Sequence, residues 1–231
     1  MFLNRCGICL APLPAIIREL RICRTCAQEI RALSNISHDG SLLVTLFQYR
    51  GPVRDLIIRA KVRSDHRALD LLQAITLAVP KALHAANWAD AIMACPSSLW
   101  GRLRGRLDLA HHLASGLAVG ANRPLLDSAP QLYWRLKKRA QNKATSARRD
   151  QMIPPLQLCT GSRGRWEARV LNLCEGRPKL LIVDDVITTG HTLQSVIATI
   201  PDGCRIKVMT LAASAEATRN FIQKEFVSQH R

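Results

Sequence analysis

Two adjacent aspartates followed by a hydroxyl-rich loop are the residues of this chain best suited to bind a sugar phosphate. Asp184 and Asp185 end a short continuous apolar run, and the loop Thr188-Thr189-Gly190-His191-Thr192 follows closely. Carboxylates accept hydrogen bonds from ribose hydroxyls, while free amides at a helix N-terminus and the partial positive charge there suit a phosphate. The order of these groups therefore predicts a ribose phosphate site.

The flanking residues predict the elements that position this site. The apolar run 180–183 is typical of a strand buried on both faces. A helix is predicted after the loop, from the spacing of Leu193, Val196, Ile197 and Ile200. In open α/β sheets, ligands bind at the carboxyl ends of strands. The alternative is an ordinary strand-loop-helix unit whose acids only cap the helix.

Segment 180–192 resembles the phosphoribosyl pyrophosphate (PRPP) signature of type I phosphoribosyltransferases. The resemblance implies that Asp184 and Asp185 engage the ribose hydroxyls of PRPP, which is bound together with Mg²⁺. It implies that the 5′-phosphate is held by four residues of the following loop, namely Thr188, Thr189, Gly190 and Thr192. His191 falls at a variable position and is expected to be a solvated helix-start residue.

Four cysteines near the start of the chain have the spacing of a metal site. Cys6 and Cys9 form one Cys-x2-Cys pair, Cys23 and Cys26 form a second, and thirteen residues separate the pairs. Two such turns supply the tetrahedral thiolates that Zn²⁺ favours in closed, structural sites. The spacing leaves iron open as the metal, and a pair of disulfides is the main rival. The remaining cysteines, Cys95, Cys159, Cys174 and Cys204, are expected to be small buried hydrophobic residues.

The charge balance indicates anionic partners. The 231 residues include 33 Lys and Arg against 17 Asp and Glu, a formal charge of +16. Nucleic acid, phosphorylated metabolites and acidic membrane surfaces all suit such a chain. No apolar stretch approaches the ~20 residues of a membrane span. The first residues carry Arg5 and two cysteines and do not read as a signal peptide, so a reducing, cytoplasmic setting is expected.

The pattern along the chain predicts an α/β fold preceded by a small zinc-ribbon-like module. The module spans residues 1–33, a polar linker covers 34–40, and the main domain spans 40–231. Strands that alternate with helices indicate a mostly parallel sheet covered on both faces. Helices are predicted over 52–61, 65–79, 107–117 and 215–227, and further strands over 91–94 and 206–211.

A basic segment, residues 131–150, differs from its surroundings. Its candidate nucleic-acid contacts are Lys137, Lys138, Arg139 and Arg148. Trp100, Trp134 and Trp166 lie beside basic residues, an arrangement that permits base stacking with phosphate contact, or that places partly buried packing residues. The segment could equally be a mobile hood over the ribose phosphate site, or a solvated face.

The combination of cysteine module and PRPP signature resembles the ComF/GntX family, whose members are associated with DNA uptake and natural competence. The stretch Tyr49-Arg50-Gly51-Pro52-Val53-Arg54, the downstream Lys61 and the segment 203–212 match the family. Two other motifs depart from it. Gly105-Arg106-Leu107-Asp108 inverts the Arg-Gly order and replaces Asn by Asp, and Lys138 stands where Thr is usual.

Three functions follow from these observations. The chain is expected to be a ComF-like protein that binds PRPP with Mg²⁺ and single-stranded DNA during uptake, alongside DNA-processing protein partners. It could instead sense PRPP without any transfer. The enzyme alternative is a phosphoribosyltransferase, a glycosyltransferase that moves ribose 5-phosphate to an unknown acceptor. No single residue stands out as the general base of that reaction, so the catalytic residues are unknown; Asp108 and His111 are candidates on a predicted helix surface.

Overall fold

The computed structural model of the chain describes residues 5–12, 22–33, 42–96, 107–126, 132–133, 157–158, 167–187 and 191–214. Two regions with predicted structure, the linker 34–40 and the helix 215–227, lie outside these residues. Most of the basic segment 131–150 also lies outside them.

The main domain is built on a five-stranded sheet whose order is β1-β7-β6-β2-β3. Every neighbouring pair in it is parallel, which confirms the predicted α/β class. The strands are β1 (Leu43–Gln48), β2 (Ala91–Ala94), β3 (Leu125–Leu126), β6 (Lys179–Ile187) and β7 (Arg205–Ala213). A separate antiparallel pair joins β4 (Leu132–Tyr133) to β5 (Gln157–Leu158).

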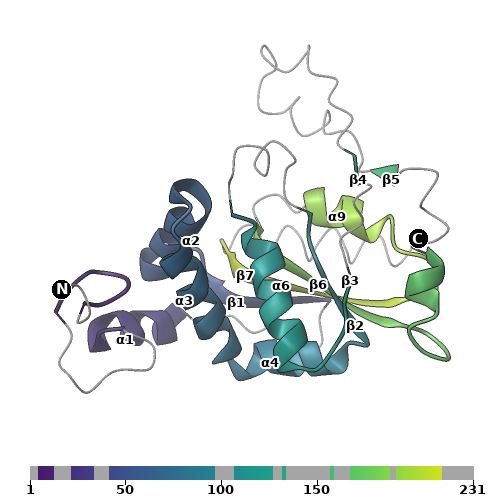
Figure 1. Cartoon of the computed structure of the whole chain (residues 1–231), viewed down its shortest axis with the longest axis horizontal. Helices are drawn as coiled ribbons and strands as arrows, with labels where there is room; N and C mark the ends of the chain where they lie inside the picture. Colours follow the sequence, from purple (N-terminus) through teal and green to yellow (C-terminus); the bar gives the residue numbers. More distant parts are fainter. Residues whose placement is uncertain are drawn as a thin grey trace, which may run out of the picture.

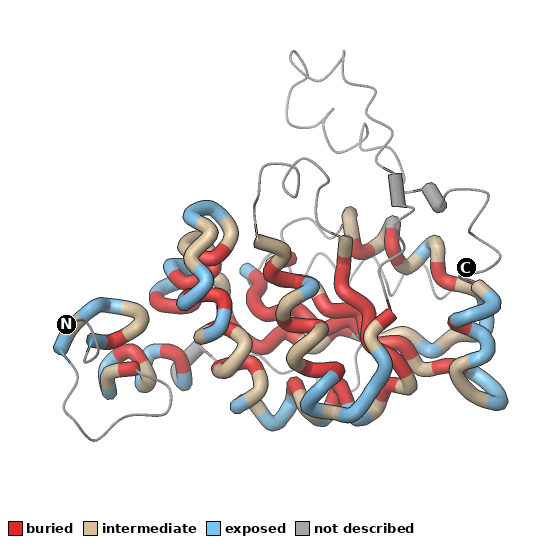
Figure 2. The backbone as a smooth tube through the Cα atoms, viewed as in Figure 1, coloured by how far each residue is buried: buried red, intermediate tan, exposed pale blue. Residues whose placement is uncertain are grey.

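Helices cover both faces of the sheet. On one face lie α2 (Gly51–Arg63), α3 (His66–Leu77), α4 (Pro80–Trp88) and α6 (Leu109–Gly120), with α1 (Arg24–Leu33) packed beside α2 (Figure 1). On the other face lie α9 (His191–Ile197) and the helical turn 167–171. Side chains of β6 alternate between the two cores, since Leu181 and Val183 join the first and Leu180 and Ile182 the second. Figure 2 shows the buried residues concentrated in the sheet and on the helices that pack against it.

The chain leaves two neighbouring strands in opposite directions. From β2 it passes through α6 to β3, whereas from β6 it passes through α9 to β7, on the other side. The two helices accordingly lie on opposite faces, as right-handed crossovers require. The boundary between β2 and β6 is therefore the topological switch point of the sheet, where α/β proteins bind ligands.

Local sequence signals set the ends of the helices around this point. Pro52 occupies the first turn of α2, where its missing N–H costs no hydrogen bond, and Ser64 ends that helix in the left-handed conformation at φ 51°. The Asp65 carboxylate caps α3 by accepting from the amides of Arg67 and Ala68. The Asp108 carboxylate caps α6 by accepting from the amide of His111.

The structure corrects two expectations about single elements. β6 runs through Ile187, so the two aspartates lie inside the strand, because β7 continues to pair with it there. Cys95 is buried as expected, but Cys174 and Cys204 are only half-buried, near the opposite end of the sheet. Cys159 lies outside the described residues.

None of the helices in the described part of the chain has the length and apolarity that crossing a bilayer requires.

Candidate functional site

The two aspartates lie where the sheet opens at its switch point. The last pair between β2 and β6 joins Ala94 to Val183, so Asp184 is the first residue of β6 past the end of β2. On the other side, β7 still pairs with β6 as far as Ile187. The edge of β6 is thus free of β2 at the residues that carry carboxylates.

Asp185 forms an ion pair with a lysine from α2. Its Oδ2 lies 2.7 Å from Nζ of Lys61, and its Oδ1 accepts a 2.7 Å hydrogen bond from the amide of Val186. The Asp185 side chain is 13% exposed and that of Lys61 43%, so the pair sits at the rim of the site, open to water on the lysine side. Lys61 was not assigned to the site from the sequence. Only the packing of α2 against the sheet brings the two residues together.

Asp184 is held in a less favourable environment. Strand alternation directs it to the face opposite Asp185, and its Oδ1 accepts the amide of Asp185 at 2.9 Å. Burial, followed by the charge of Asp185, raises the pKa of Asp184 to about 7, against the smaller opposing effects of that amide and of Lys61. Asp184 is therefore partly protonated near neutral pH.

Two further groups from other elements face the same place. Cys95 follows β2, and its amide donates to the carbonyl of Val183 at 2.7 Å. Burial raises the pKa of the Cys95 thiol, and the charges of Asp184, Asp185 and Asp108 raise it further. Asp108, the capping residue of α6, thus lies in the field of the same site, whereas His111 is exposed. Once Asp184 is ionised, Asp184 and Asp185 together carry more negative charge than the Lys61 ammonium balances.

The structure places only part of the predicted phosphate loop. Thr192 is half-buried in the first turn of α9, and the backbone of His191 begins that helix. Thr188, Thr189 and Gly190 lie outside the described residues, in the three-residue interval between β6 and α9. The candidate nucleic-acid contacts Lys137, Lys138, Arg139 and Arg148 also lie outside them.

The four cysteines of the first module do come together. The sulfur atoms of Cys6, Cys9, Cys23 and Cys26 all lie within 4.8 Å of one another. Tetrahedral Zn–S bonds of 2.3 Å would separate the sulfurs by about 3.8 Å, so the cluster needs only a small contraction to hold that ion. The 3.6 Å between the sulfurs of Cys9 and Cys23 is too long for a disulfide, and all cysteines in the described residues are free.

Each cysteine pair sits on a different local structure. The first occupies a tight turn closed by the amide of Leu10 on the carbonyl of Cys6 and by a bridge between Arg5 and Pro12. The second pair lies at the start of α1, with Cys26 in its first turn. The second pair thus uses a helix start where a ribbon would use another hairpin. A helix N-terminus favours the anionic sulfurs that a metal needs.

Hydrogen bonds to sulfur indicate a thiolate site. The amide of Cys23 donates to Sγ of Cys6 at 3.3 Å, and the amide of Cys26 donates to Sγ of Cys23 at 3.4 Å. Burial alone would raise the pKa of Cys6, but amides of Cys23, Cys9 and Ile8 outweigh it and lower that pKa to about 7. Burial, together with the neighbouring sulfurs, raises the pKa of Cys26. Without a cation the four sulfurs cannot all ionise, so the donor set fits a divalent metal.

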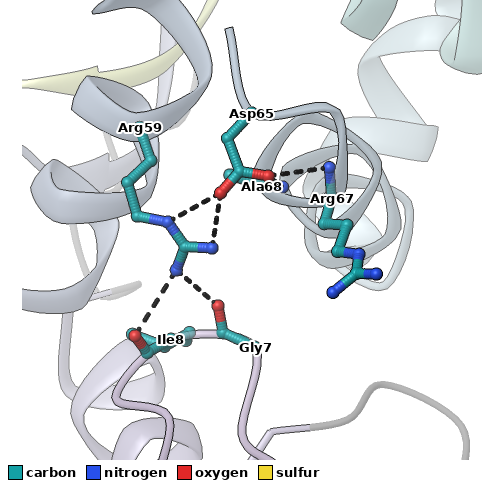
Figure 3. A network of polar contacts seen from close by, with 6 residues as sticks. All are labelled: Gly7, Ile8, Arg59, Asp65, Arg67 and Ala68. Atoms are coloured by element: carbon teal, nitrogen blue, oxygen red, sulfur yellow. Dashed lines mark hydrogen bonds and ion pairs between the residues drawn. The ribbon is translucent and has the colours of Figure 1, made fainter. Parts of the chain in front are cut away.

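The cysteine turn, the turn between Cys6 and Cys9, is bound to the main domain through Arg59 of α2. Its Nη1 donates to the carbonyls of Gly7 at 2.6 Å and Ile8 at 3.4 Å, while Nε and Nη2 donate to Oδ2 of Asp65 at 2.9 and 2.6 Å (Figure 3). Cys6, Cys26 and Ile30 also belong to the same apolar core as α2.

Comparison with models of known protein families and with functionally curated proteins finds no match to this chain. The candidate sites therefore depend on their own geometry and chemistry.

The first prediction concerns the metal. Protein purified under reducing conditions should contain one zinc per chain by elemental mass spectrometry, and Cys6→Ser/Cys9→Ser should contain none. Because this short module buries too little to fold alone, hydrogen exchange over residues 22–33 should rise in that variant. Cys174→Ser/Cys204→Ser, outside the cluster, is the control. Reduced native protein with no bound metal would contradict the assignment.

The second prediction concerns the loss of folding stability caused by the ionised Asp184 carboxylate. Its folded pKa of about 7 exceeds the ordinary 3.8, so ionisation opposes folding as pH rises from about 4, and the full penalty applies above about 7. At about 1.4 kcal/mol per pKa unit the ceiling is near 4 kcal/mol, and partial exposure reduces it. Asp184→Asn should stabilise the protein by about 1–3 kcal/mol at pH 8 in urea denaturation, with little effect at pH 4.

Exposed Asp202→Asn is the matched control for this measurement. It should leave stability within about 0.5 kcal/mol of the parent at both pH values, as most surface substitutions do. An Asp184→Asn variant less stable than the parent at pH 8 would show that the carboxylate is well solvated or favourably paired.

Proposed function

We propose that this protein is ComF-like: it binds PRPP with Mg²⁺ at the carboxyl end of β6 and contacts single-stranded DNA during uptake or processing. The observation that carries the proposal is the location of Asp184 and Asp185 at the switch point of an all-parallel sheet, immediately past the end of β2. Ligand sites of α/β proteins form there, and the segment resembles the PRPP signature of type I phosphoribosyltransferases.

The charges of the site favour this ligand over a bare phosphate. Asp184 and Asp185 repel an uncompensated anion, and Lys61 forms an ion pair with only one of them, Asp185. Ribose hydroxyls, in contrast, donate hydrogen bonds to carboxylates. A divalent cation on the pyrophosphate would neutralise both ligand and site. The phosphate end of the ligand is assigned to Thr188, Thr189, Gly190 and Thr192 through the resemblance.

Each described residue has a definite role in this proposal. Asp185, oriented by Lys61 and by the amide of Val186, presents its carboxylate to one ribose hydroxyl. Asp184 accepts a hydrogen bond from the other hydroxyl. This hydrogen bond would replace those to water that Asp184 loses on burial. Lys61, which is 43% exposed, keeps enough freedom to turn toward an anionic group of the ligand.

An active phosphoribosyltransferase is the second candidate, and the intact signature from Leu180 to Thr192 favours it. Transfer requires a nucleophile at the anomeric carbon as pyrophosphate leaves. Positioning and charge neutralisation would supply most of the catalysis. Incubation with PRPP, Mg²⁺ and a panel of bases and nucleic acids separates the candidates: pyrophosphate release that depends on one acceptor identifies an enzyme.

The third prediction tests the ribose assignment. Asp184→Asn/Asp185→Asn should weaken PRPP binding by at least tenfold in titration calorimetry with Mg²⁺, because hydrogen bonds to a charged acceptor contribute about 1.5–3 kcal/mol each. Asp202→Asn is again the control and should bind as the parent does. Unchanged affinity in the double variant would reject the assignment, since the variant is expected to remain folded.

The fourth prediction tests DNA contact by the basic segment. Binding of single-stranded DNA should weaken steeply with salt, and Lys137→Gln/Lys138→Gln/Arg139→Gln should lower the slope of log K against log salt by up to about 2, as counterion release predicts. A control with the same charge change uses three exposed cations of α2, α3 and α4: Arg63→Gln/Arg67→Gln/Lys81→Gln. Equal slopes for the parent and the first variant would exclude this segment as the contact.

A further inference from the structure

Helix α2 carries two cationic side chains that connect the four-cysteine module (residues 1–33) to the carboxylate site around Asp184 and Asp185. Arg59 and Lys61 are two residues apart, a spacing that directs side chains to different sides of a helix. Arg59 reaches the cysteine turn and Lys61 reaches Asp185. The last turn of one helix therefore touches both candidate sites.

The contact of Arg59 with the cysteine turn depends on the conformation of that turn. Its two acceptors, the carbonyls of Gly7 and Ile8, belong to the residues between the ligands Cys6 and Cys9. Metal bonds to both cysteines would fix these two carbonyls, because only two residues separate the ligands. Loss of the metal would free the turn, which is too short to keep its conformation by burial.

The other donors of Arg59 extend the contact to the end of α2. Nε and Nη2 both bind Oδ2 of Asp65, and the amide of Asp65 donates to the carbonyl of Arg59 at 3.1 Å. The Arg59 side chain is only 21% exposed, so the guanidinium cannot exchange its protein acceptors freely for water. If the carbonyls of Gly7 and Ile8 withdraw, either Arg59 or the last turn of α2 must move.

We propose that metal loading of the four-cysteine site sets the ligand affinity of the carboxylate site, with Arg59 as the positioning residue. Metal fixes the carbonyls of Gly7 and Ile8, these hold Arg59, and Arg59 holds the turn of α2 from which Lys61 meets Asp185. The metal module thereby acts on the ribose phosphate site without contributing a residue to it. The inference rests on the proposed function, since the affinity concerned is that for PRPP.

The test compares zinc-loaded and chelator-treated protein, each as parent, Arg59→Met and Arg54→Met. Arg54 lies on the same helix with a 52% exposed side chain and is the control. PRPP affinity is measured by calorimetry with Mg²⁺, and folding by circular dichroism. We expect a five- to twentyfold loss of affinity on zinc removal, a similar loss in zinc-loaded Arg59→Met, and little further loss when both are combined, within the usual range of coupling between sites. Arg59→Lys should recover part of the affinity.

Hydrogen exchange provides a readout that does not require PRPP. Zinc removal should speed exchange at 60–63 of α2 and 184–187 of β6 in the parent, with no change at 113–120 of α6. Zinc-loaded Arg59→Met should show the faster exchange already. A purely structural tether would instead change stability and exchange throughout the domain, or only within 5–12.

The outcomes separate this inference from the proposed function. Zinc-loaded parent that fails to bind PRPP overturns the proposed function, and hydrogen exchange then decides whether the two sites communicate through Arg59. Zinc removal that leaves both PRPP affinity and exchange at 184–187 unchanged overturns the inference, as does an Arg59→Met variant that behaves like Arg54→Met.

Discussion

The pairing of β6 with its two neighbours is the constraint on which the rest of the structure depends. A strand buried on both faces must satisfy its peptide groups through adjacent strands, and β6 does so with β7 along its whole length but with β2 only as far as Val183. Beyond that point one edge is open to polar ligands. The chain places its two carboxylates there, and α2 and α6 direct Lys61 and Asp108 to the same end. The site is thus a consequence of unequal strand lengths in a parallel sheet.

This arrangement is unfavourable for stability, and that is informative. Asp184 and Asp185 lie next to each other in a half-buried position, and the nearby Lys61 forms its ion pair with Asp185. Burial and repulsion by Asp185 raise the pKa of Asp184 to about 7. A fold selected only for stability would use an amide or an apolar residue at Asp184. Perturbed carboxylates in open positions are typical of sites where a ligand supplies the missing hydrogen bonds or charge. The cost at Asp184 is therefore an argument for ligand binding that does not depend on any resemblance.

The sequence predicted the elements with strong local patterns. β2 was placed at 91–94 because its apolar run ends at Cys95-Pro96, and α2 and α3 were found from Pro52 and Asp65. β1 and α4 were missed: the alanine-rich α4 has no clear apolar stripe, and β1 is too short a run for periodicity to separate strand from helix. The pairing of Lys61 with Asp185, and of Arg59 with Gly7, could not be predicted. These contacts arise from the packing of α2 between module and sheet, and no local pattern encodes it.

The contrast between the whole chain and the site bears on how two anionic ligands would be accommodated. The chain carries +16, a field that attracts any polyanion, whereas the described part of the site is electronegative. The DNA backbone is anionic, carries no fixed cation and has no pair of free ribose hydroxyls. The carboxylates would therefore repel it. PRPP brings both hydroxyls and a bound metal. On the proposed function, DNA and PRPP would therefore occupy different surfaces of one basic protein, and binding of one would not exclude the other.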